Sequence, residues 1–467
     1  METILRHFAA LSKIPRRSGD EAAAADYILS YAKSRGCAAF SDPMHNVRIV
    51  KPAVSPAKAD RTIMVQGHLD MVYVTEGSAR YENGIVPMEQ DGFLSAKGSS
   101  LGADNGIAAA YALRLLDLDD PELPNLEILL TAQEESGLQG AAAIHPSSLK
   151  SRTIINLDSE EEGVFVTGCA GGMDCLMLLP QRTETTETPH IPVTITLSGL
   201  QGGHSGMDIG REGGNAVVLA ARLLLKLLNA GVKIRGVQAE GRANVIPASA
   251  VISAYVQPEA AEDLRRFLAD AEEKFNRTLP DRLTISAEQG APCPSFSHYI
   301  PYTVKSLVTL LLNCPNGVLQ RDCTGQVLTS ANVAAVTEEA GHFRILTSVR
   351  SAFSTEKYAL ADKMSLLADA FGIKAVFHGD YPAWQPAPHS PLRETAAALY
   401  QSMFGVPPVL QTIHAGLECG IFSQKLPDAD ILSFGPTILD VHSVRERADV
   451  ASIQRTWDFL LALLKRL

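Results

Sequence analysis

The sequence lacks several features that would assign it to common classes of protein. It has no apolar run long enough to cross a membrane, and its first residues lack the basic and then apolar pattern of a signal peptide. Its net charge of -11 argues against binding to nucleic acid or to an anionic membrane surface. Its seven cysteines show no Cys-x-x-Cys spacing, which indicates reduced thiols rather than a thiolate zinc site. We therefore expect a cytoplasmic protein with no nucleic-acid or membrane partner.

The length and composition indicate a globular protein with more than one domain. A chain of 467 residues is too long for a single hydrophobic core, so two domains are expected. Its hydrophobic content of 46% and its charged content of 20% are ordinary for globular proteins. No internal repeat and no low-complexity segment is visible in the sequence.

In the stretch of residues 63–72, a mostly apolar run ends in Gly67 and is followed by His68 and Asp70. In an extended strand, residues i and i+2 point to the same side, so the imidazole of His68 and the carboxylate of Asp70 are predicted neighbours. A carboxylate beside an imidazole fixes its tautomer, as it does in many metal sites. For this pair alone, a structural histidine beside a turn aspartate is the simpler interpretation.

Three acidic motifs follow along the chain. Asp104 ends a Gly/Ser-rich loop before a helix predicted over residues 107–118, which it could simply cap. Glu134 and Glu135 follow a buried strand, where adjacent carboxylates are costly unless a cation offsets their repulsion. A solvated acidic turn is the alternative for this pair. Asp158 ends a further apolar strand.

The order of the predicted elements indicates the fold class. Apolar strands alternate with helices, and the helix predicted over residues 22–33 follows Ser18 and Glu21 at the spacing of a capping box. This alternation predicts an α/β fold with a mostly parallel sheet flanked by helices. Ligands bind such sheets beyond the carboxyl ends of the strands. The side chains expected at that edge are those of His68, Glu134, Glu135 and Asp158, with Asp104 on a loop within reach.

The pattern changes at about residue 188. Half-exposed strands and a charged helix predict an α+β insertion with mainly antiparallel strands. A Pro-rich segment at residues 380–388 reads as a linker back to the first domain. We therefore predict a discontinuous first domain, residues 1–187 and 386–467, and an inserted domain, residues 188–385.

The candidate side chains include the ligand types of a metal centre. Imidazole nitrogen and carboxylate oxygen are ligands that zinc accepts. Five such ligands suit two metal ions that share one bridging carboxylate, and a further glutamate could act as general base on a water between them. The chemistry that this arrangement favours is amide hydrolysis. The candidate ligands are His68, His442, Asp104, Asp158 and one glutamate of the Glu134–Glu135 pair.

Taken together, these motifs resemble those of the M20 metallopeptidases, a family of di-zinc exopeptidases. The resemblance covers nearly the whole chain, in the family's order and at about its spacing. Within the family, residues 102–106, 168–172 and 414–420 are similar to those of the Xaa-His (aminoacyl-histidine) dipeptidases. The motifs that carry the family resemblance are Gly67-His68-Leu69-Asp70, Gly102-Ala103-Asp104, Glu134-Glu135-Ser136-Gly137, Asp158 and His442.

The resemblance implies two zinc ions, although manganese and cobalt accept the same ligands. It also implies a catalytic first domain, with the insertion acting as a lid and dimerisation domain. The resemblance further implies a role for each of seven side chains. Asp104 bridges the two ions, His68 and Asp158 complete one site, and Glu135 and His442 complete the other. Glu134 is the general base, and Asp70 orients His68.

Four further residues are candidates for substrate binding. His204, on a Gly-rich loop, resembles the lid histidine that assists the scissile carbonyl, often across a dimer, but its spacing equally suits an exposed turn histidine. Arg350 could clamp the substrate carboxylate through two hydrogen bonds. Asn244 could donate to the same carboxylate or to the oxyanion. His414 could contact the substrate or pack within its Gly-containing loop.

We therefore expect a homodimeric di-zinc dipeptidase that cleaves Xaa-His dipeptides such as β-alanyl-histidine, with the lid closing over the substrate. By the resemblance, Asp158 stands where many deacylase or carboxypeptidase members have glutamate, which favours a dipeptide with a free amino terminus. One alternative is another M20 amidohydrolase, such as a tripeptidase or an N-acyl amino-acid deacylase. The other is a non-catalytic scaffold with the same fold.

Overall fold

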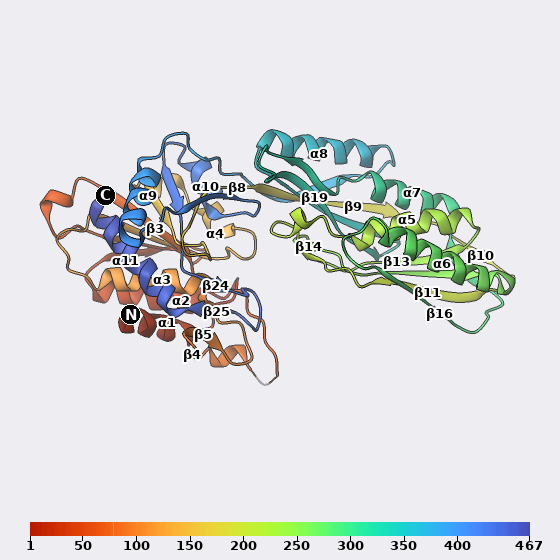
Figure 1. Ribbon diagram of the computed structural model, residues 1–467, viewed down its shortest axis with the longest axis horizontal. Helices are drawn as coiled ribbons and strands as arrows, with labels where there is room; N and C mark the ends of the chain where they lie inside the picture. The colour runs from red at the N-terminus through yellow and green to blue at the C-terminus, as the bar shows by residue number, and fades with distance from the viewer. Residues whose placement is uncertain (78) are drawn as a thin grey trace. The chain divides into compact units, whose positions relative to one another are not determined.

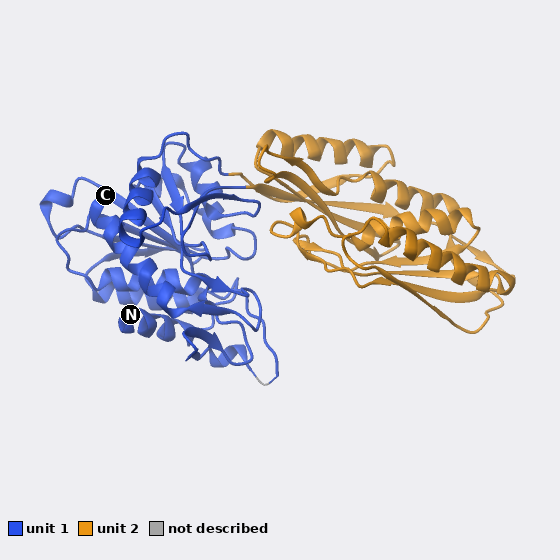
Figure 2. Ribbon diagram, in the orientation of Figure 1, with its two compact units in different colours: residues 1–169, 384–467 blue, residues 170–383 orange. Residues whose placement is uncertain are grey.

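The computed structural model describes residues 1–77 and 79–467 and divides into two compact units. Unit 1 comprises Met1–Cys169 and Trp384–Leu467, and unit 2 comprises Ala170–Ala383 (Figure 2). Each unit has a hydrophobic core of its own. Among the described residues, no helix combines the length and the apolar character needed to cross a membrane.

Unit 1 is built on a mixed sheet of eight strands (Figure 1). The strands are β1 Ala38–Ser41, β2 Val47–Lys51, β3 Thr62–His68, β6 Asn125–Thr131, β7 Thr153–Asn156, β8 Val164–Cys169, β22 Val409–Ile413 and β23 Asp430–Ser433. Their order is β1-β2-β6-β3-β7-β23-β8-β22. The four central strands β6, β3, β7 and β23 run parallel to one another. Their apolar runs are buried, as central parallel strands require. The predicted α/β fold with a mostly parallel sheet is confirmed.

Helices cover both faces of this sheet, because alternate side chains of a strand point in opposite directions. The helices of unit 1 are α1 Glu2–Ser12, α2 Ala22–Ser34, α3 Ala103–Leu116, α4 Gln139–Ala143, α9 Pro391–Phe404, α10 Glu418–Lys425 and α11 Val450–Arg466. Ile63 and Val65 of β3 join the main core with residues of α1, α2 and α3. The neighbouring Gln66 points to the other face, where its Nε2 donates a hydrogen bond to Glu418 of α10.

A smaller sheet of unit 1 holds the loop that carries His442. Its strands are β4 Pro87–Gln90, β5 Phe93–Ala96, β24 Ile438–Leu439 and β25 Arg447–Asp449, in the order β24-β25-β5-β4. Arg447 of β25 pairs with Ser95 of β5. The loop between β24 and β25 therefore ends beside the segment that leads from β5 to Asp104.

Unit 2 consists of two antiparallel halves with the same topology. The inner half contains β11 Ile191–Ser198, α5 Ala216–Asn229, β13 Lys233–Gln238, β15 Ala250–Val256, α6 Ala261–Asn276 and β16 Thr284–Gln289. The outer half contains β9 Gly171–Pro180, α7 Pro301–Asn313, β18 Gly317–Arg321, β19 Val327–Glu339, β20 His342–Ser351, α8 Ser354–Asp369 and β21 Ala375–Tyr381. The sheet orders are β13-β15-β11-β16 and, with β18 added at one edge, β18-β19-β20-β9-β21.

The inner half is inserted into the outer half. Strands β10 Thr183–Thr186 and β17 Phe296–Tyr299, which lead into it and out of it, pair antiparallel with each other. Each half thus repeats a strand–helix–strand–strand–helix–strand arrangement that the sequence did not reveal. The predicted α+β insertion with antiparallel strands is confirmed.

One predicted domain boundary differs from the boundary between the units. The sequence pattern predicts it between residues 187 and 188, whereas unit 2 begins at Ala170. The reason is β9, which pairs with β20 from Gly171↔Ser351 to Pro180↔His342 and so belongs to the outer sheet of unit 2. At the other end, unit 2 stops at Ala383, close to the predicted residue 385.

Candidate metal centre

The carboxylate of Asp104 lies between two histidines that are far apart in the sequence. Its Oδ1 is 3.1 Å from Nε2 of His68, and its Oδ2 is 3.1 Å from Nε2 of His442. His68 is the buried last residue of β3, whereas His442 lies on the loop between β24 and β25 with a φ of 58°. A single carboxylate thus faces two imidazoles through different oxygens, as a bridging metal ligand would.

Two groups of potential ligands share Asp104. In the first group, Oδ1 of Asp158 is 3.3 Å from Nε2 of His68. In the second group, Oε1 of Glu135 is 2.8 Å from Nε2 of His442. Within each group, the potential ligand atoms lie within 4.8 Å of one another. The structure therefore brings all five predicted ligands together.

The acidic groups of this cluster disfavour one another's charge. Burial and the nearby Asp104 raise the pKa of Glu135 to about 7. Burial and the neighbouring carboxylates also raise the pKa of Glu134 well above its usual range. Burial acts to lower the pKa of His442, but its hydrogen bonds to Asp104 and Glu135 raise it to about 11. Bound cations would offset this repulsion, and imidazole and carboxylate are ligands that zinc accepts, so the donor set fits two divalent cations.

Asp70 connects His68 to the turn that carries the two glutamates. Its Oδ1 accepts a hydrogen bond from the backbone N of Glu134 at 3.0 Å, and its Oδ2 accepts one from the backbone N of Glu135 at 3.1 Å. Nδ1 of His68 lies 3.0 Å from the backbone O of Asp70 and 3.4 Å from its Oδ1. Both of these atoms are acceptors, so they favour a proton on Nδ1, and Nε2, which faces Asp104 and Asp158, is the nitrogen that would bind a cation. Burial acts to raise the pKa of Asp70, but the contact with His68 holds it below its usual range.

The predicted capping box at Ser18 and Glu21 is wrong. Helix α2 has no side-chain cap at its N-terminus. Instead, Oγ of Ser18 donates to Oδ2 of Asp70 at 2.8 Å, and Oε1 of Glu21 accepts from the backbone N of Gln133 at 3.0 Å. Both residues therefore support the acidic turn. From the sequence alone, a glutamate that caps its own helix cannot be distinguished from one whose partner lies 112 residues away.

Asn105 is a further supporting residue that the sequence pattern did not single out. Its Nδ2 donates to Oδ1 of Asp158 at 2.6 Å, and its Oδ1 accepts from the backbone N of His68 at 3.3 Å. A Cβ at Gly67 would lie 2.4 Å from the same Oδ1. The glycine before His68 is therefore required by the close approach of Asn105.

Glu418 of α10 is a buried carboxyl group behind β3. Its Oε2 accepts hydrogen bonds from Nε2 of Gln66 at 2.5 Å and from Oγ1 of Thr131 at 2.6 Å. Its Oε1 has no hydrogen-bond partner within residues 1–77 and 79–467. Burial raises the pKa of Glu418 to about 8. This raised pKa favours the protonated form of the carboxyl group at neutral pH.

We expect Glu418→Gln to change the pH dependence of stability. Because folding raises this pKa, the group's contribution to stability is complete below about pH 4.5 and is lost as the pH rises through about 8. Glutamine does not titrate. As the pH rises across that window, the free energy of unfolding of the variant should therefore increase relative to that of the parent by up to about 1.4 kcal/mol per pH unit. Denaturant titrations of both metal-free proteins at several pH values measure this gain. A constant difference between the two proteins would contradict the raised pKa.

His204 and Asn244 are neighbours in unit 2. His204 pairs with Val245 across a short antiparallel ladder, and the backbone N of Ser205 donates to the backbone O of Asn244 at 2.8 Å. Two loops of the inner half thus present these candidates side by side.

The other two candidates for substrate binding lie elsewhere. Arg350 is in β20 of unit 2, and its Nη1 donates to the OH of Tyr381 at 2.7 Å. The Nε of Arg350 is buried and has no hydrogen-bond partner in the part of the chain that the structure describes. His414 belongs to unit 1, on the loop between β22 and α10.

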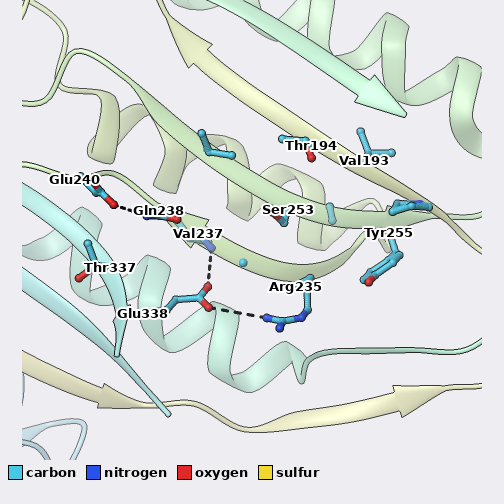
Figure 3. Close-up of a pocket in the computed structure, with 14 residues that line it drawn as sticks. Val193, Thr194, Arg235, Val237, Gln238, Glu240, Ser253, Tyr255, Thr337 and Glu338 are labelled. Carbon is cyan, nitrogen blue, oxygen red and sulfur yellow. Dashed lines mark hydrogen bonds and ion pairs between the residues drawn. The ribbon is translucent and has the colours of Figure 1, made fainter. Parts of the chain in front are cut away.

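A cavity of about 570 Å³ in unit 2 is lined by residues of β11, β13 and β15 in the inner half and by Thr337 and Glu338 of β19 in the outer half (Figure 3). In its wall, Oε1 of Glu338 accepts from the backbone N of Val237 at 3.0 Å, and Oε2 lies 3.9 Å from Nη1 of Arg235. The lining residues include none of the predicted metal-binding, catalytic or substrate-binding residues. The cavity therefore does not coincide with the candidate site.

Comparison with known proteins decides the family. The family model described as Peptidase family M20/M25/M40 matches residues 64–466. The chain belongs to this family. This M20 peptidase is 32% identical over 468 residues to the cytosol non-specific dipeptidase of Escherichia coli (strain K12), a match that covers 98% of this chain and 96% of that protein. The resemblance seen in the sequence is confirmed, and the protein is a hydrolase of peptide bonds.

Solved structures agree with this assignment. The aminoacylhistidine dipeptidase from Vibrio alginolyticus matches with a TM-score of 0.83 and 31% identity, over 100% of this chain and 96% of that one. A tripeptidase from Staphylococcus aureus matches with a TM-score of 0.62 at 14% identity, over 99% of this chain and 97% of that one. The second likeness shows a shared fold alone. Both cover the residues of unit 1 and of unit 2.

Proposed function

We propose that this M20 peptidase is a dipeptidase that works with two zinc ions. The observation that carries the proposal is the position of Asp104, whose two carboxylate oxygens face two separate groups of potential ligands. In this proposal His68 and Asp158 complete one site, and Glu135 and His442 complete the other. Manganese or cobalt would accept the same ligands.

Glu134 is the proposed general base. When bound, the two cations supply the Lewis acidity that lowers the pKa of a water and polarises the peptide carbonyl. The carboxylate of Glu134 lies beside His68 and Glu135, within 4.8 Å between ligand atoms, but belongs to neither group that shares Asp104. It would take a proton from the attacking water and return it to the departing amine. The hydrogen bond from its backbone N to Asp70 supports this position.

Arg350 is proposed to bind the carboxylate of the substrate. Its buried Nε, which has no hydrogen-bond partner among the residues described, leaves one side of the guanidinium able to donate. His204 and Asn244 are proposed to assist at the scissile carbonyl or the oxyanion, and His414 to contact the substrate from the first unit.

We propose Xaa-His dipeptides, such as β-alanyl-histidine, as preferred substrates. The Vibrio relative is named an aminoacylhistidine dipeptidase, which supports this preference, whereas the Escherichia coli relative is named non-specific. The latter name also supports a cytosolic location. A homodimer remains our proposal from the family resemblance, and analytical ultracentrifugation tests it.

A hydrolysis screen tests the proposed activity. The protein is stripped of metal, reconstituted with zinc, and incubated with dipeptides, tripeptides and N-acetyl amino acids. We expect zinc-dependent cleavage of dipeptides, fastest for those with a carboxyl-terminal histidine. Faster cleavage of tripeptides or N-acetyl amino acids would favour the other M20 activities. Failure of the zinc-loaded protein to cleave any dipeptide would contradict the proposal.

A further inference from the structure

Glu446 is a buried carboxylate that binds four successive backbone amides. Its Oε2 accepts hydrogen bonds from the backbone N of Leu101 at 2.8 Å and of Gly102 at 3.0 Å. Its Oε1 accepts from the backbone N of Ala103 at 2.8 Å and of Asp104 at 3.4 Å. One side chain therefore satisfies every backbone N–H of the segment that ends at the shared carboxylate.

The same side chain belongs to the loop that carries His442. Glu446 follows His442 by four positions, directly before β25. The side chain of His442 is 46% exposed, so packing does little to hold it. Its Nε2 nevertheless lies 3.1 Å from Asp104 and 2.8 Å from Glu135. The hydrogen bonds of the Glu446 carboxylate thus connect the loop that carries this exposed histidine directly to the segment that ends at Asp104.

Arg16 holds the same segment from its carbonyl side. Its Nη2 donates to the backbone O of Gly102 at 2.6 Å, and its Nη1 donates to the backbone O of Leu69 at 2.8 Å and of Asp70 at 3.2 Å. A Cβ at Gly102 would lie 2.6 Å from Sδ of Met71 and 2.8 Å from Nη2 of Arg16, and its φ of 69° also favours glycine. The buried guanidinium also offsets the negative charge of Glu446. Residues 101–104 are therefore held through their four backbone N–H groups and through the C=O of Gly102.

We propose that Glu446 is a positioning residue for the second metal site, the group formed by Asp104, Glu135 and His442. This inference rests on the proposed function. Glu446 acts through Asp104 and His442 and has no part in the chemistry itself. Without its carboxylate, up to four buried amides lose their acceptor, which costs free energy unless the segment rearranges. A rearranged segment would move the bridging carboxylate away from His442.

The test measures metal binding separately from peptide hydrolysis. Glu446→Gln keeps the size of the side chain but only one acceptor oxygen, and Glu446→Ala keeps none. Matched controls are Glu127→Gln and Glu127→Ala. Glu127 is also a buried glutamate of unit 1, and its Oε2 accepts from the backbone N of Lys150 at 3.0 Å and of Ser151 at 2.9 Å. Zinc affinity and stoichiometry are read by competition with a chromophoric chelator, and folding by thermal melting of the metal-free proteins.

We expect the parent and both Glu127 variants to bind two zinc ions with similar affinity. The Glu446 variants should bind one of the two ions about 10- to 100-fold less tightly, with alanine worse than glutamine. Affinities within about threefold of the parent would overturn the inference, as would an equal loss in the Glu127 variants. If the alanine variant does not fold, the glutamine variant decides. A parent protein that does not bind two ions would instead contradict the proposed function.

Discussion

Replacing Glu134 by glutamine is expected to lower kcat by about 10²- to 10⁴-fold, the usual contribution of a general base. Glutamine has nearly the same size but cannot take a proton from water. The backbone hydrogen bond between Glu134 and Asp70 does not involve the replaced side chain, so the turn should keep its shape. We therefore expect KM and a content of two metal ions to stay near those of the parent. Steady-state kinetics on the best dipeptide and metal analysis of the purified variant measure both. Full activity would refute the role of Glu134 as base.

The neighbouring Glu135 provides a control within the same turn. Its Oε1 lies 2.8 Å from Nε2 of His442, so Glu135→Gln should weaken one of the two metal sites. The two variants then differ in kind, because one keeps its metal and loses turnover while the other loses metal. Glu134 also forms a group of potential ligands with His68 and Glu135. The two variants therefore also test the reverse assignment, in which Glu134 is the metal ligand and Glu135 is the general base. In that case Glu134→Gln would lose an ion and Glu135→Gln would keep both.

Replacing Asp104 by asparagine should have the largest effect on metal binding. Its two oxygens face His68 and His442 at 3.1 Å each, so one substitution removes a charged ligand from both groups. We expect both ions to bind more weakly and kcat/KM to fall by at least about 10³-fold, because metal ions stabilise the transition state by several kcal/mol. Zinc titration of the metal-free variant and dipeptide hydrolysis at saturating zinc measure the two effects.

Asp158→Asn is the matched control for the shared carboxylate. Asp158 lies 3.3 Å from Nε2 of His68 and belongs only to the first group. Its replacement should weaken one ion and leave the other close to the parent. Binding of two ions by Asp104→Asn with the parent's affinity would show that Asp104 does not bridge two metals.

Much of the fold was predictable because its causes are local. The buried apolar runs that became β3, β6 and β7 follow from periodicity and composition, and so does helix α3 between β3 and β6. The boundary at Ala170 was not predictable, because β9 pairs with β20, whose partner residues lie more than a hundred positions later. The repeated topology of unit 2 was hidden for a related reason, since the inner half interrupts the outer half after β10.

The supporting residues of the candidate site divide in the same way. The position of Asp70 near His68 was predictable, because alternation along a strand sets it. Glu21 and Glu446 were not, since their partners lie 112 and more than 340 positions away in the chain. A glutamate that accepts hydrogen bonds from distant backbone amides produces no recognisable pattern in the residues next to it in the sequence.

The sequence by itself determined which donor atoms the candidate site offers, because those atoms depend only on residue type. They belong to His68, Asp104, Glu135, Asp158 and His442. The sequence also determined the strands that end at these residues, because hydrophobic period is a local property. Only the tertiary structure decided which oxygen of Asp104 faces which histidine. His442 comes from 338 positions away, and its distance to Asp104 depends on packing and hydrogen bonds between segments that share no local pattern.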